Sequence, residues 1–171
     1  MKSLIALVKA GSIVLCLGLG AVANAASFSP SGAILTTSSG GTITIKSAST
    51  FGAAVNCSFA FTGVVEPEGA GLKINTVSLS GGAICALYQP TDLPWRLTPT
   101  SIATGQITGM ALTYATTSPA WPATHCAPST VSVSLANTPG GLSVGASNQA
   151  LTGGCTIVSL GAVAPGITVL P

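Results

Sequence analysis

The sequence predicts an all-β protein, a single antiparallel β-sandwich with an immunoglobulin-like or jelly-roll layout. Short segments alternate apolar and polar residues with a period of two, which is typical of half-buried strands. Glycine- and proline-containing turns separate these segments, and no window beyond the N-terminal leader has an apolar stripe with helical spacing. Many short strands joined by turns favour one sandwich domain, which we place at residues 26–171.

The N-terminus predicts a signal peptide at residues 1–25. An apolar stretch over residues 10–23 follows two lysines, and Ala23-Asn24-Ala25 then offers the small side chains that signal peptidase reads. A retained membrane anchor is the alternative, but the stretch is shorter than the roughly 20 residues of a spanning helix. We therefore expect a secreted protein, extracellular or loosely bound to the cell surface after transit through the periplasm, with no integral membrane segment after cleavage.

The clearest strand is predicted at residues 55–62, where Val55, Cys57, Phe59 and Phe61 fall on one face. Residues 130–135 alternate as strictly. Weaker candidates cover residues 41–47, 72–80, 107–114, 155–160 and 167–170. The last of these segments could pair with the sheet edge of a neighbouring molecule.

Four cysteines remain after the leader, with its Cys16, is removed, and an even number in an exported chain predicts two disulfides. Of the three pairings, we favour Cys57 with Cys85 and Cys126 with Cys155, because each closes a loop of similar length around a hairpin-like segment. Each bridge is expected to stabilise the fold by roughly 3–4 kcal/mol. The cysteines lack the short C-x-x-C spacing of a metal or redox site, so we expect no metal.

Charged residues make up only 5% of the chain, against roughly 25% in an average soluble domain. The predicted mature chain keeps three basic and three acidic residues, so its formal charge is zero. A nucleic-acid partner is excluded, because phosphate binding needs a dense set of lysines and arginines. Electrostatic steering of other partners is also not expected.

The candidate catalytic residues do not make a convincing enzyme. Residues 141–145 match the G-x-S-x-G pattern around Ser143, and Asp92 and His125 complete a hydrolase triad on paper. Such an elbow needs a helix after the serine, with the acid and the histidine later in the chain, whereas here both precede it. Glu66 and Glu68 flank one proline in a turn, which does not place two carboxylates across a cleft. We expect no catalytic residues and no cofactor.

Trp95 and Trp121 both lie in proline-containing loops. One interpretation is that they are exposed apolar contacts for a lipid, hydrocarbon or protein surface. The other, which we favour, is that each fills one end of the core.

Several segments together resemble one protein family. They are the leader end Ala23-Asn24-Ala25, residues 26–30, residues 56–63, the segment from Ile84-Cys85 to Leu93-Pro94-Trp95, and residues 153–157. In these the chain is similar to the PraA/PraB family of alkane-oxidation protein activators. The resemblance implies a small secreted bacterial protein that promotes growth on long-chain alkanes, by helping to disperse or take up the hydrocarbon, and it implies no catalytic residues.

The expected partner is therefore a hydrocarbon or cell surface. A charge-poor, apolar protein should adsorb there, because it loses little hydration on contact. The alternative is a cell-surface adhesin or fibre subunit, since zero net charge and Ser/Thr/Gly-rich strands also favour self-association.

Overall fold

The computed structural model describes residues 26–36, 40–115 and 122–171. The predicted leader at residues 1–25, with Cys16, and Trp121 lie outside these ranges. The strands are β1 (Ser27–Ser29), β2 (Ile34–Thr36), β3 (Gly41–Lys46), β4 (Val55–Val65), β5 (Leu72–Ser80), β6 (Tyr88–Thr91), β7 (Trp95–Pro99), β8 (Thr104–Tyr114), β9 (Thr124–Thr138), β10 (Gly141–Leu151), β11 (Cys155–Ala164) and β12 (Thr168–Leu170). Three short 3-10 helices join them, η1 (Ala48–Thr50), η2 (Pro67–Gly69) and η3 (Cys85–Leu87).

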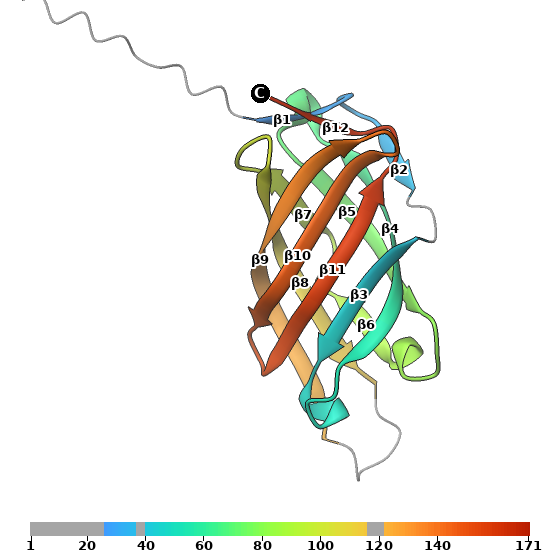
Figure 1. Cartoon of the computed structure of the whole chain (residues 1–171). Coiled ribbons are helices and arrows are strands. Elements are labelled where there is room, and N and C mark those ends of the chain that lie inside the picture. The colour runs from blue at the N-terminus through green and yellow to red at the C-terminus, as the bar shows by residue number, and fades with distance from the viewer. Residues whose placement is uncertain (1–25, 37–39, 116–121) are drawn as a thin grey trace, which may run out of the picture.

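The prediction of an open sandwich is wrong, because the main sheet closes into an eight-stranded β-barrel. The order β4-β3-β11-β10-β9-β8-β7-β5 returns to β4 through a direct β4–β5 ladder (Figure 1). Every pairing is antiparallel, and most neighbours in the barrel are consecutive in the chain. The pairing between the strands farthest apart in the chain joins β3 and β11, with Ile43 opposite Leu160.

Two of the barrel's strand positions are each shared by two short strands. Strand β2 pairs with β4 at residues 62–64, and β3 pairs with the same side of β4 at residues 55–59. Strands β6 and β7 divide β8 in the same way, β6 at residues 111–114 and β7 at residues 105–108. These extra segments lengthen the barrel wall without adding positions to it.

Side chains from all the barrel strands fill the interior. Alternation places one face of each strand inside, as the buried Cys57, Phe59 and Phe61 of β4 show. Large side chains occupy the centre and include Trp95, Met110 and Leu112, each at most 1% exposed. Eight strands give an interior just wide enough to be filled by side chains, and here they form one continuous core.

Strands β1 and β12 form a two-stranded ribbon across one end of the barrel (Figure 1). Phe28 and Val169 lie opposite each other in this ribbon and are buried. The side-chain amide of Asn137 on β9 donates to the carbonyl of Val169 and accepts from its N–H, both at 2.9 Å. The terminal strand, which we considered as a partner for a neighbour's edge, is therefore paired within its own chain.

Within the described ranges, no helix is long and apolar enough to cross a membrane.

Candidate functional site

Trp95 is part of the core and makes no exposed contact. It begins β7, is 1% exposed, and its indole N–H donates to the carbonyl of Thr91 at 2.9 Å. Of the two interpretations of the tryptophans, the core one therefore holds at this position. Trp121 lies outside the described residues.

The exposed apolar groups lie elsewhere, and Phe51 is the largest aromatic among them. Its side chain is 76% exposed, in the turn between η1 and β4. Its φ of 52° is in the left-handed region, which non-glycine residues seldom adopt. A bulky residue held there has to be fixed by its surroundings.

Buried hydroxyl groups fix the backbone around Phe51. The Thr50 hydroxyl accepts the N–H of Ser47, and its single proton lies nearest the carbonyl of Ala53, at 2.8 Å, with the carbonyl of Ser47 next at 3.1 Å. The Ser47 hydroxyl bonds to the buried hydroxyl of Tyr88 at 2.7 Å. These bonds tie the turn to the barrel wall on both sides of the exposed ring.

Ser49 ties the same turn to the segment that leads into β9. Its backbone N–H donates to the hydroxyl of Thr124, and its own hydroxyl donates to the carbonyl of Pro122. Ser49 is fully buried and Thr124 is 4% exposed, so the bond between these two residues is shielded from water, whereas Pro122 is exposed. The turn is thus a rigid support for Phe51.

A second exposed apolar side chain, Ile84, lies at the same end of the barrel. It is 42% exposed and directly precedes Cys85, which forms a disulfide to Cys57 near the start of β4. The turn that carries Phe51 leads into the start of β4 as well. Neither residues 47–54 nor residues 81–87 include a charged side chain. We call these two segments the Phe51 end.

The disulfides follow the pairing that the loop lengths favour. Cys57 is bonded to Cys85 and Cys126 to Cys155, across 28 and 29 residues of sequence. All four cysteines are therefore unavailable as metal ligands. No group of three or more potential metal ligands occurs in the part of the chain that the structure describes.

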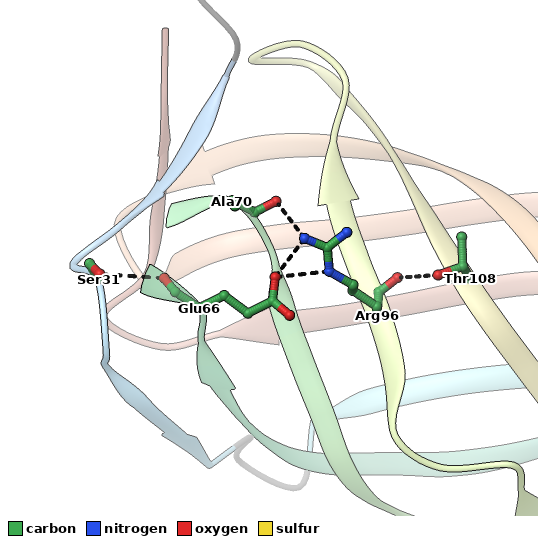
Figure 2. Close-up of polar contacts among 5 residues, drawn as sticks. All are labelled: Ser31, Glu66, Ala70, Arg96 and Thr108. Carbon is green, nitrogen blue, oxygen red and sulfur yellow. Dashed lines mark hydrogen bonds and ion pairs between the residues drawn. The ribbon is translucent and has the colours of Figure 1, made fainter. Parts of the chain in front are cut away.

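Lys46 is exposed and directly precedes the Phe51 end, whereas an ion pair between two other charged residues lies at the other end of β4. Arg96 on β7 donates from Nε and from a terminal nitrogen to one carboxylate oxygen of Glu66, at 2.8 and 2.6 Å (Figure 2). Glu66 directly follows β4, whereas Phe51 precedes it, so ion pair and ring lie at opposite ends of that strand. Hydrogen bonds to Glu66 raise the pKa of the Arg96 guanidinium, which stays charged. This pair clamps the η2 turn to β7.

The hydrolase triad written from the sequence does not form. Ser143 lies opposite Ala136 near the end of β9, whereas His125 lies near its beginning. Eleven residues of extended strand separate these two positions on β9, which is roughly 36 Å at the usual rise per residue. No proton can pass directly between side chains so far apart.

Sequence reasoning missed both Phe51 and Ile84. The available signal was an aromatic residue directly before a glycine, in a stretch of serine, threonine and alanine where no core strand was predicted.

The whole chain, residues 1–171, matches the protein family described as alkane oxidation protein activator PraA/PraB-like. No curated protein and no solved structure matches the chain.

Proposed function

Because the chain belongs to the PraA/PraB-like family of alkane oxidation protein activators, we propose that it is a secreted, non-catalytic protein that promotes bacterial use of long-chain alkanes. It acts by adsorbing through the Phe51 end at the hydrocarbon or cell-surface interface. Two disulfides support export, since such bonds persist in oxidising compartments.

The exposure of Phe51 is the observation that carries this proposal. A ring that is 76% exposed on a hydrogen-bonded turn needs little reordering before it enters an apolar phase. Burying one such side chain contributes about 1.5–3 kcal/mol, which corresponds to roughly tenfold to a hundredfold in adsorption. Ile84 adds a second exposed apolar side chain at the same end of the barrel, and neither segment itself contains a charged residue.

The filled interior of the barrel favours contact of the hydrocarbon with the outer surface over its enclosure inside the barrel. Leu35, Leu72, Trp95, Leu97 and Met110 are each at most 1% exposed within one packed core. An alkane entering the barrel would have to displace side chains packed at close to crystalline density. Contact at the outer surface avoids that cost.

The test compares Phe51→Ser with Ile102→Ser, which removes a 56% exposed apolar side chain from the opposite end of the barrel. Adsorption is measured as interfacial tension at a hexadecane–water drop, and function as growth on hexadecane of a strain that lacks the wild-type gene. We expect Phe51→Ser to weaken adsorption about tenfold or more and to slow growth, and Ile102→Ser to change neither. Equal behaviour of the two folded variants would contradict the proposal.

The alternative function, a fibre or adhesin subunit, predicts a different state in solution. A monomer of the purified protein would favour the interface function, whereas ordered polymers would favour the fibre.

A further inference from the structure

The barrel wall is interrupted between β9 and β10. Their ladder begins at the pair Thr138–Gly141 and ends at the pair Ser134–Gly145. Beyond it, β9 continues to pair with β8 as far as Thr124, and β10 continues to pair with β11 as far as Leu151. The two strands therefore part from each other while each stays held on its other side.

The side-chain amide of Gln149 occupies this opening. Its oxygen accepts the backbone N–H of Ser132 on β9 at 3.1 Å, and its nitrogen donates to the carbonyl of Ser147 on β10 at 2.9 Å. Ser132 and Ser147 are the residues that the same register would place opposite each other. One amide thus makes the two bonds that a peptide group of an intervening strand would make.

The amide of Gln149 bridges the two strands at the level of Ser132 and Ser147. An interposed amide and a second hydrogen bond add up to about 5 Å to a direct backbone bond, which is close to one inter-strand spacing. Asn148, with φ of 50°, interrupts the regular pairing of β10 with β11 at this point. The register of β10 with β11 is the same on both sides of Asn148, so no residue is inserted there, and Gln149 reaches Ser132 through its side chain.

The opening is closed again at its far end. The N–H of Ala127 donates to the carbonyl of Thr152, and the N–H of Thr152 donates to the hydroxyl of Ser129, both at 2.9 Å. The disulfide between Cys126 and Cys155 lies beside these bonds. The stretch of β9 between these bonds and the ladder, residues 130–133, is roughly 13 Å long in extended conformation, enough for about four residues of a peptide.

A hollow of about 600 Å³ lies over the opening. Its lining includes the polar side chains of Gln106, Ser132, Ser134 and Ser147, and Val133 and Leu160 from the core. None of its lining residues is charged. The surroundings thus suit a strand whose side chains alternate between small polar and apolar types.

We propose that the opening between β9 and β10 is a binding site for an extended, uncharged polypeptide segment of another protein. The segment adds as a strand between Ser132 and Ser147, and Gln149 fills its place when the segment is absent. Recognition is by backbone hydrogen bonds, with the apolar floor accepting alternate side chains. This site is independent of the Phe51 end and of hydrocarbon binding.

The probe is a fluorescent synthetic peptide with blocked ends and the uncharged sequence of residues 130–135, TVSVSL. Binding to the wild-type protein is measured by fluorescence anisotropy, together with hydrogen exchange of the Ser132 N–H. We expect saturable binding that slows this exchange. Gln149→Ala empties the opening, so it should bind the peptide roughly fivefold to tenfold more tightly, whereas Gln89→Ala, on β6, should match the wild type.

A peptide of the same sequence, N-methylated at alternate residues, separates strand addition from adsorption, because it lacks half of the backbone donors. It should not bind. Equal binding of both peptides, or no binding to either wild type or Gln149→Ala, would overturn the proposal. Protection of the Ser132 N–H by dimerisation without peptide would assign the opening to a second copy of this chain and would also overturn it.

Discussion

Trp95 shows how strongly a single residue depends on its neighbours for its role. Its sequence context, after a proline and before an arginine, is that of a loop, yet its ring fills the barrel and its N–H is bonded to Thr91. We predict that Trp95→Ala lowers the free energy of unfolding by roughly 3–5 kcal/mol, because it leaves a large cavity. Urea unfolding measures the loss, and Trp95→Phe should lose less.

Measuring adsorption distinguishes a core role of Trp95 from a role as an exposed contact with the hydrocarbon. Folded Trp95→Phe should adsorb to hexadecane as the wild type does, because the ring is not on the surface. Weaker adsorption of this variant at unchanged stability would return Trp95 to the contact surface.

Tyr88 links the hydroxyl network to pH. Burial raises the pKa of its hydroxyl above the ordinary value of about 10, while hydrogen bonds to Ser47 and Thr50 act in the opposite direction. The unfolded chain therefore releases this proton at lower pH than the folded chain, so its contribution is complete below about pH 10 and is lost as the pH rises above it.

We predict that Tyr88→Phe weakens this alkaline loss of stability and costs about 1 kcal/mol at neutral pH, where the bond to Ser47 is missing. Thermal melts from pH 7 to 11 measure both effects. If the melting temperatures of the wild type and Tyr88→Phe fall equally steeply above pH 10, the alkaline loss of stability comes from groups other than Tyr88.

At the scale of elements, the β1–β12 ribbon depends on Asn137. Its amide makes two hydrogen bonds to the backbone of Val169, one to the carbonyl and one to the N–H. We predict that Asn137→Ala destabilises the protein by about 1–3 kcal/mol, since the carbonyl and the N–H of Val169 lose their hydrogen bonds to the Asn137 amide. Hydrogen exchange should accelerate at Val169 and remain unchanged at Ile43, which serves as the internal control.

Strands could be predicted from the sequence where the side chains on the two faces of the strand differ in size and polarity. Residues 55–62 alternate large apolar with small polar side chains, and they lie within β4. Strand β10 was missed because Gly145, Ala146 and Ser147 differ too little in size and polarity to indicate a face. Strand β7 was missed because Pro94 and Trp95 suggested a rigid loop.

At the scale of the whole molecule, alternation does not distinguish a sandwich from a barrel. Both bury one face of every strand, so the same pattern fits either. The difference lies in the β3–β11 pairing, where Ile43 meets Leu160, and no local signal in the sequence specifies so distant a contact. The exposure of Phe51 had a local signal, an aromatic residue before a glycine in a turn, but its place at the end of a closed barrel had none.

The two disulfides should have different functional effects. We predict that replacing either pair by alanines lowers the free energy of unfolding by about 3–4 kcal/mol, because the loops are of similar length. Only the loss of Cys57–Cys85 should also weaken adsorption, since that bond holds the segment with Ile84. Denaturant melts and drop tensiometry on both double variants measure this, and equal adsorption would contradict the link.

Adsorption of the protein should also be almost independent of salt. The three acidic and three basic residues of the 26–171 chain balance, so no net charge is available to be screened. We expect the same interfacial tension at low and at high sodium chloride. A steep decrease in adsorption with salt would indicate an electrostatic contact instead of the apolar one.

The pairing of β3 with β11 has a consequence for the newly made chain. Strand β3 is synthesised early, but its partner on that side ends only at Ala164, so the sheet keeps two open edges until translation is almost complete. Open edges of strands with few charged residues are templates for aggregation, and Lys46 is the one charged residue of β3. A chain ending at residue 154 should therefore accumulate as insoluble aggregates, and the full chain should benefit from a holding chaperone until its last barrel strand is available.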